Sequence, residues 1–217
     1  MAGFLDTLRV LRWDDHRYYH HSRINQSLHL LSAISFLCAY VMVFKNPVAA
    51  VLIGWIVGMC SRQAGHFFFE PRDYDHVNHA THDHKEEIKV GYNLQRKVVL
   101  MAAWILAPCV LAFDPSFFGL LEPHATPSEL AHNVAVLWIA VAVLGLLFRT
   151  VQLFFIKDVQ TGLAWATKIV TDPFHDIYLY HKAPFYLLRG ELMDPMEHVH
   201  APAEDDDGEE PVIIERR

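Results

Sequence analysis

The 217-residue chain has the length of a single domain, and with 53% hydrophobic and 20% charged residues it is too apolar for an ordinary soluble fold. Its net charge of −7 reflects an acidic run over residues 204–210, and its Lys and Arg residues form no basic patch interleaved with aromatics, which argues against nucleic acid as a partner. Three cysteines without CxxC spacing argue against a disulfide framework and a thiolate metal site.

The N-terminal segment lacks the uninterrupted apolar core and cleavage site of a secretory signal, and its apolar positions predict a short amphipathic helix on the membrane surface. Four later stretches are long and apolar enough to cross a bilayer, which needs about 20 helical residues. Lys45-Asn46-Pro47 predicts a tight break between the first two. We expect the membrane spans at residues 28–44, 47–69, 98–113 and 134–156.

The last third of the chain is interrupted by charge and proline, so residues 161–195 are expected to lie in the headgroup region rather than to span. Residues 1–200 are then a single polytopic membrane domain, and residues 201–217 are expected to be a disordered acidic tail. The predicted fold class is an all-α integral membrane protein with four transmembrane helices and interfacial amphipathic segments on the cytoplasmic side.

Orientation follows from the positive charges that flank the spans. Lys and Arg are frequent before the first span, between the second and third, and after the fourth, whereas residues 114–133 contain none. The N-terminus, the central loop and the C-terminus are therefore predicted to be cytoplasmic. The compact size and the lack of an ER-retrieval ending favour a bacterial inner membrane over the endoplasmic reticulum.

Fifteen histidines are about three times the ordinary usage, and all except His124 and His132 fall on the predicted cytoplasmic side. Several imidazoles that converge can bind iron, zinc or copper. His29 and His66 carry most weight, because each lies just inside an apolar stretch, where a polar side chain is costly. Helical spacing adds two sets, His16 with His20 and His76 with His79 and His82, the second of which would share a face if that segment is helical. The candidate metal ligands are His16, His20, His21, His29, His66, His79 and His82.

Two segments resemble a known family. The first, YYHHSRINQSLH, contains HHxxxNxxxH at the start of the first span, and the second, GHFFFEPR, closes the second span. Together they resemble the membrane 2-hydroxy fatty acid dioxygenase family over residues 13–72. Downstream of GHFFFE the family usually continues with an Arg-Pro-Ala-type sequence, whereas this chain has the histidine-rich loop PRDYDHVNHATHDHKEE.

The resemblance implies an Fe(II)-dependent enzyme that uses O₂ to shorten 2-hydroxy fatty acids by one carbon. It implies that His20 or His21, together with His29 and His66, are metal ligands or catalytic residues. Asn25 would be their polar partner and Glu70 its acidic counterpart, and both are candidate substrate-binding residues. Arg23, Arg62 and Arg72 are candidates to bind a substrate carboxylate, because guanidinium groups suit carboxylates.

Three alternatives stay open at this point. The spacing of His16, His20 and His21 also imitates one histidine box of di-metal fatty acid hydroxylases and desaturases, although a later HxxHH box is missing. The site could hold one or two ions, and zinc in place of iron. The chain could also be a non-enzymatic assembly factor or scaffold. The expected partner is a membrane lipid or fatty acid, with O₂ as co-substrate, and a homo-oligomer is left open.

Overall fold

The computed structural model describes residues 3–70, 72–76 and 78–196, and the predicted tail over residues 201–217 lies outside them. The protein is 74% helical, and its described residues contain no β-strand. Within the described residues, four helical segments are long and apolar enough to cross a membrane, in agreement with the predicted number of spans. The protein is therefore built as a bundle of membrane-length helices.

The four membrane-length segments differ in regularity. The first is helix α2 (Arg23–Met42), and the fourth is the 30-residue α8 (Pro127–Ile156). The second combines α3 (Pro47–Val51), a π-helical stretch η1 (Leu52–Met59) and α4 (Cys60–Phe68). The third combines α6 (Leu94–Leu106), a 3₁₀ turn η2 (Ala107–Cys109) that contains Pro108, and α7 (Val110–Phe113). Proline at this point cannot donate a helical hydrogen bond, which accounts for the irregular turn.

Two of these helices begin several residues before the predicted spans, because polar residues cap them. The Ser22 side chain accepts a hydrogen bond from the Asn25 amide and starts α2, so its first turns bury polar side chains. Thr126 and Glu129 form a capping box at the start of α8. Hydropathy alone assigns such capped polar turns to the flanks of a span.

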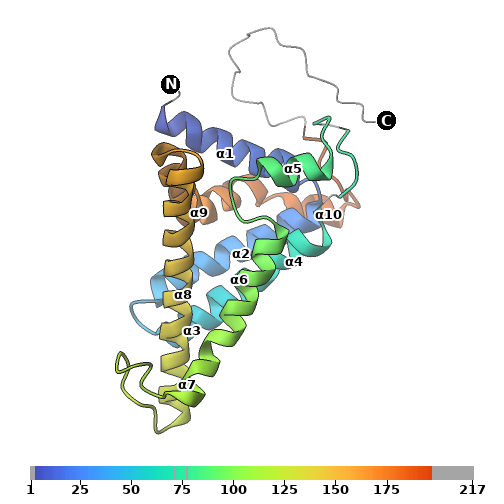
Figure 1. Ribbon diagram of the computed structural model, residues 1–217. Coiled ribbons are helices and arrows are strands. Elements are labelled where there is room, and N and C mark those ends of the chain that lie inside the picture. The colour runs from blue at the N-terminus through green and yellow to red at the C-terminus, as the bar shows by residue number, and fades with distance from the viewer. Residues whose placement is uncertain (1–2, 71, 77, 197–217) are drawn as a thin grey trace.

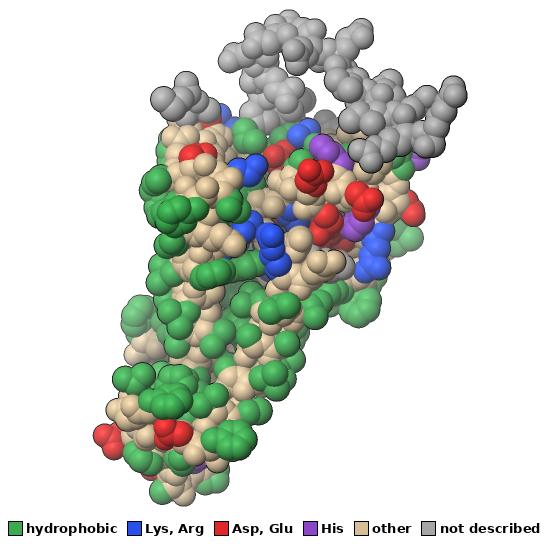
Figure 2. Space-filling view, in the orientation of Figure 1, with side chains coloured by type: hydrophobic (Ala, Val, Ile, Leu, Met, Phe, Trp, Pro, Cys, Tyr) green, Lys and Arg blue, Asp and Glu red, His purple; other side chains and the backbone are tan. Residues whose placement is uncertain are grey.

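Charged side chains gather at one end of the molecule. Helices α1 (Phe4–Tyr19), α5 (His82–Ile88), α9 (Val159–Tyr180) and α10 (Ala183–Leu188) lie at this end, while α7 and the loop after it lie at the other (Figure 1). Figure 2 shows most Lys, Arg, Asp, Glu and His side chains of the visible face over the same end, above a largely hydrophobic body. We call this the polar end.

Helix α9 contributes a buried polar face. The sequence predicted only an interfacial segment, interrupted by charge and proline, in this part of the chain. Lys168, Asp172, Asp176 and Tyr180 follow one another at intervals of four, so they share one face of the helix, and all four are buried. Lys168 bonds to Asp15 of α1 (3.0 Å), which ties α1 to α9. Pro173 lies inside this helix without ending it.

The histidine-rich loop departs from the prediction. His76, His79 and His82 do not share a helical face, because α5 begins only at His82, where Thr81 caps it through the His84 amide (3.2 Å). The preceding residues form a turn closed by the backbone of Asp75 and Ala80, with His79 in the left-handed region (φ 50°). A cap and a left-handed residue stop a helix that the spacing alone permits.

Helices α2 and α4 approach closely at Gly65. A Cβ atom placed on Gly65 would overlap the Asn25 side-chain oxygen, so only glycine fits between these helices without displacing that side chain. Asn25 is fully buried and donates from its amide nitrogen to the Tyr19 carbonyl (2.8 Å), which joins α1 to α2. This contact brings the start of α2 against the end of α4.

Candidate metal centre

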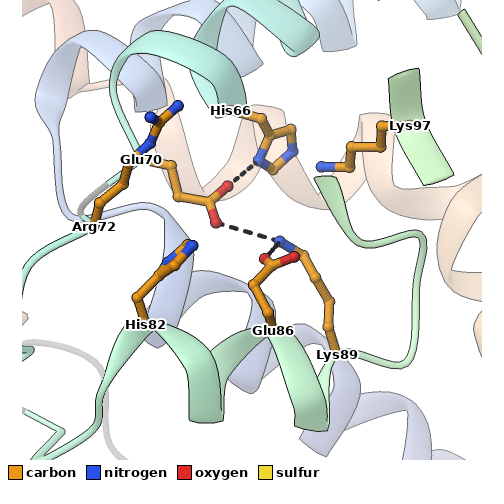
Figure 3. A pocket seen from close by; sticks show the side chains of 7 residues that line it. All are labelled: His66, Glu70, Arg72, His82, Glu86, Lys89 and Lys97. Carbon is orange, nitrogen blue, oxygen red and sulfur yellow. Dashed lines mark hydrogen bonds and ion pairs between the residues drawn. The ribbon is translucent and has the colours of Figure 1, made fainter. Parts of the chain in front are cut away.

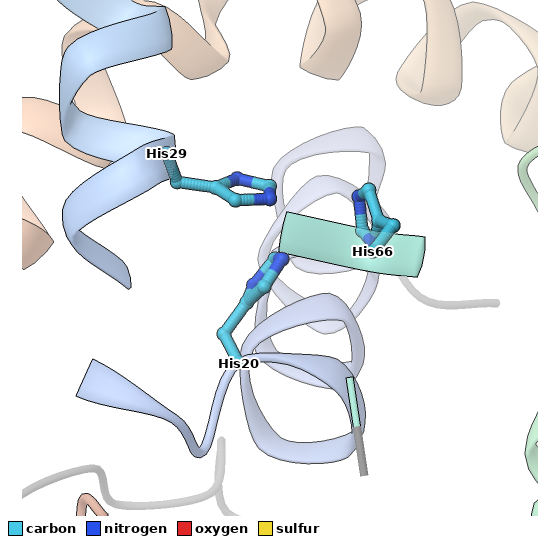
Figure 4. Close-up of side chains that lie close together, drawn as sticks. All are labelled: His20, His29 and His66. Carbon is cyan, nitrogen blue, oxygen red and sulfur yellow. The ribbon is translucent and has the colours of Figure 1, made fainter. Parts of the chain in front are cut away.

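Three buried histidines converge where α2 and α4 meet at the polar end. His20, His29 and His66 are 1%, 0% and 7% exposed, and each offers a ring nitrogen within 4.8 Å of those of the other two. Their ring centroids are 4.1 Å apart for His20 and His29, and 4.9 Å apart for His29 and His66. Figure 4 shows the three rings turned toward a common space. We call them the three-histidine group.

The group is assembled from three parts of the fold. His20 follows the last residue of α1, where the helix ends and the chain turns into α2. His29 lies in α2, and His66 lies in α4 next to Gly65. The contact at Gly65 therefore sets the separation between His29 and His66, and the turn after Tyr19 brings His20 to them.

Two of the three rings are oriented by hydrogen bonds at Nδ1. His66 Nδ1 lies 2.8 Å from a carboxylate oxygen of Glu70, and His20 Nδ1 lies 2.9 Å from the Tyr180 hydroxyl. A carboxylate only accepts, so His66 carries its proton on Nδ1 and has a lone pair on Nε2. A hydrogen bond from the non-ligating nitrogen to an oxygen is the usual support of a metal-binding histidine.

Unsatisfied nitrogens are the strongest sign of a ligand. Within the described residues, His20 Nε2 and both ring nitrogens of His29 are buried without a hydrogen bond. The closest acid to His29 is Asp176, whose carboxylate lies 3.7 Å from Nδ1, which is too long for a hydrogen bond. Buried polar groups nearly always have partners, and leaving one unpaired costs about 1–3 kcal/mol. One metal ion would satisfy His20 Nε2 and one of the two nitrogens of His29, because an imidazole offers a single nitrogen to a given ion.

The protonation state of the group also suits a cation. Burial lowers the pKa of His20 well below its usual value, and a positive charge on neighbouring His29 would lower it further. His20 is thus neutral and able to coordinate at physiological pH. Three neutral imidazoles without a carboxylate in the group are ligands suited to iron, zinc or copper, and they leave coordination positions open.

A network of ion pairs supports the group from α9. Arg62 donates to Asp176 (3.0 Å), and Arg12 of α1 donates to Asp172 (3.4 Å). The Tyr180 hydroxyl also lies 3.0 Å from His16 Nδ1, so it joins two histidines at the end of α1. Asp176 and Tyr180 were not predicted as site residues, although their spacing with Asp172 places all three on one helical face and could have indicated them.

The other predicted metal ligands lie outside the three-histidine group. His16 faces Tyr180, and His21 contacts the Arg17 carbonyl and Asp75. His82 lines a pocket beside His66, and His79 is exposed in the loop before α5. Between the adjacent His20 and His21, the structure thus brings only His20 to His29 and His66.

The candidate substrate-binding residues have different surroundings in the structure. Arg23 and Arg62 pair with Asp194 and Asp176, so their guanidinium groups are already bound to carboxylates. Only Arg72 lines the pocket beside His66. Asn25 holds the end of α1, and Glu70 orients His66. Their substrate-binding roles stay predictions.

Replacing Glu70 with glutamine should weaken metal binding. The amide can accept the bond from His66 Nδ1, but it removes the negative charge that strengthens His66 as a ligand. Metal affinity should fall by about tenfold or more, measured by competition with a chelator of known affinity. Glu87→Gln is the matched control, since Glu87 is exposed on α5. Equal affinities in all three proteins would contradict this role of Glu70.

No family model, no curated protein and no solved structure matches this chain.

Proposed function

We propose that the protein is a membrane-embedded metalloenzyme whose three-histidine group holds one metal ion. The observation that carries this proposal is the convergence of three buried imidazoles within 4.8 Å, two of which, His20 and His29, have ring nitrogens without a hydrogen bond. A structural role alone leaves His29 without any hydrogen-bond partner. The described residues contain one such group, which favours one ion over the paired ions of hydroxylases and desaturases.

The metal we propose is Fe(II), with O₂ as co-substrate. Imidazole suits iron, and the resemblance of the HHxxxNxxxH and GHFFFE segments supports iron over zinc. When bound, the ion would supply O₂ activation at its open coordination positions. The chain's own residues hold it: Glu70 and Tyr180 fix the outer nitrogens of two ligands, and burial keeps His20 neutral.

The proposed substrate is a 2-hydroxy fatty acid. One O₂ converts R–CH(OH)–COOH into R–COOH, CO₂ and H₂O, so the bond between C1 and C2 breaks and the substrate is oxidised as O₂ is reduced. A fatty acid is suited to a site at the polar end of membrane-length helices. Its carboxylate would reach the three-histidine group while its acyl chain remains in the hydrocarbon region of the membrane. The family resemblance supports this reaction class.

We also propose that the polar end faces the cytoplasm of a bacterial inner-membrane protein. Four spans bring both termini to one side, and the Lys and Arg residues that flank the spans favour the cytoplasm for that side. Helix α1 would then lie along the inner surface of the membrane.

A turnover assay tests this function directly. Purified protein loaded with Fe(II) is incubated with 2-hydroxypalmitate and O₂, and products are analysed by mass spectrometry. We expect pentadecanoic acid in the wild type and none in a folded His66→Ala variant. Iron-loaded protein that leaves the substrate unchanged would refute the lipid oxygenase. Protein that binds no metal would favour a scaffold.

A further inference from the structure

A cationic pocket opens beside the three-histidine group. It is lined by side chains from the end of α4, the following loop, α5 and the start of α6, namely His66, Glu70, Arg72, His82, Glu86, Lys89 and Lys97. His66 belongs to both the pocket and the group, so whatever occupies the pocket lies next to the proposed metal. Figure 3 shows most of these side chains directed toward the space, whereas the guanidinium group of Arg72 turns away from it, toward the Phe67 carbonyl.

The charges of the pocket do not balance. Lys89 bonds to both acids, at 3.3 Å from Glu70 and 3.0 Å from Glu86, and its side chain is 8% exposed. Lys97 has no hydrogen bond or ion pair with any described residue, and Figure 3 shows its ammonium group directed toward His66. The lining contains three basic side chains, Arg72, Lys89 and Lys97, and only two acidic ones, and Arg72 donates to the Phe67 carbonyl (2.9 Å) rather than to either acid. An anion is the complementary occupant.

The helices that supply the pocket also expose apolar side chains. Phe68 and Phe69 come shortly after His66 in the sequence and are exposed, as is Val98 next to Lys97. The end of α4 and the start of α6 thus offer hydrophobic surface to an acyl chain attached to the anion. A free inorganic anion would make no use of these residues.

We propose that Lys97 and this pocket bind the anionic head of an acyl lipid and hold it beside the three-histidine group. The proposal rests on the proposed function for the identity of the substrate, but not for the binding itself. A carboxylate or a phosphate supplies the required chemistry, and Lys97 would donate a charge-assisted hydrogen bond to either. Lys97, rather than Arg23 or Arg62, then recognises the head, since both arginines are already paired.

Binding of a fluorescent fatty acid tests the proposal without O₂ or turnover. Full-length protein in detergent is titrated with cis-parinaric acid and with its methyl ester, for the wild type and for Lys97→Gln. We expect the variant to bind the acid about tenfold or more weakly, as for loss of a hydrogen bond to a charged group, and to bind the ester unchanged. Arg96→Gln, an exposed cation next to Lys97, is the matched control and should bind the acid like the wild type.

Displacement of the probe distinguishes the two heads. Stronger displacement by palmitate than by hexadecyl phosphate identifies a carboxylate site, and the reverse order identifies a phosphate site. Displacement by neither, or equal affinity of the acid in wild type and Lys97→Gln, would overturn the proposal. Because this experiment measures binding and not turnover, its outcome does not depend on the outcome of the oxygenase assay.

Chemical protection extends the test to a case in which Lys97→Gln does not fold. Wild-type protein is acetylated with and without palmitate, and modification is read by mass spectrometry, with exposed Lys182 as the internal reference. We expect palmitate to slow acetylation of Lys97 and not of Lys182. Equal rates at Lys97 with and without palmitate would exclude it from the binding site.

Discussion

Replacing His29 with leucine should remove the metal ion while leaving the metal-free protein at least as stable as the wild type. Both ring nitrogens of His29 are buried without hydrogen bonds, so the imidazole costs free energy unless a ligand pairs with it. Leucine fills a similar volume without that cost. Metal affinity should fall by more than the roughly 10–100-fold that loss of an outer-shell partner causes.

Mass spectrometry measures the loss of metal. Thermal unfolding of the metal-free proteins in detergent measures their stability. His181→Leu is the matched control, because His181 is exposed at the end of α9 and outside the group. It should retain the metal. A metal-free His29→Leu protein that unfolds well below the wild type would show that His29 is a structural residue, against the proposed function.

Replacing Asp194 with alanine should destabilise the protein by about 3–5 kcal/mol, the usual cost of leaving a buried charge unpaired. Asp194 is 4% exposed and accepts from Arg23 (2.8 Å) and Gln26 (2.7 Å) at the start of α2. Its backbone amide donates to the His21 carbonyl (2.7 Å), next to His20. Without the carboxylate, Arg23 stays buried without its counter-charge, and the turn that positions His20 loosens.

Denaturation of the detergent-solubilised proteins measures this effect, and Asp6→Ala is its control. Asp6 forms an ion pair with Arg9 in which both side chains are more than half exposed (57% and 65%), and such pairs contribute little. Equal stability of the Asp194→Ala and Asp6→Ala proteins would contradict a structural role for the buried pair. Metal affinity should fall in Asp194→Ala only.

The membrane-length helices could be predicted from the sequence, because hydropathy depends on residues that are close in the chain. The residues at which two of these helices begin could not be predicted from hydropathy, because Ser22 and Thr126 start the helices through capping hydrogen bonds. The spacing of His76, His79 and His82 likewise permits a helix, but His79 has a left-handed backbone that a helix does not allow. Local capping bonds and backbone conformation thus account for the differences between the predicted and observed helix boundaries.

Only part of the candidate site could be predicted from the sequence. His29 and His66 stood out because each polar ring lies in an apolar stretch, but nothing local separated His20 from its neighbour His21. That choice is made by Tyr180, which is 160 residues away from His20. Lys97 gave no signal as a pocket residue, because its neighbours there come from α4 and α5.

The dependence of His20 on Tyr180 has a consequence for biosynthesis. When the ribosome has delivered the first two spans to the membrane, all three histidines have been made, but α9 has not. His20 then lacks the hydroxyl that orients it, and the buried face of α9 does not yet cover the start of α2. The three-histidine group is therefore completed only after the last span and α9 are in place. Metal loading would then follow translation, and a nascent chain would offer no finished site to a competing ion.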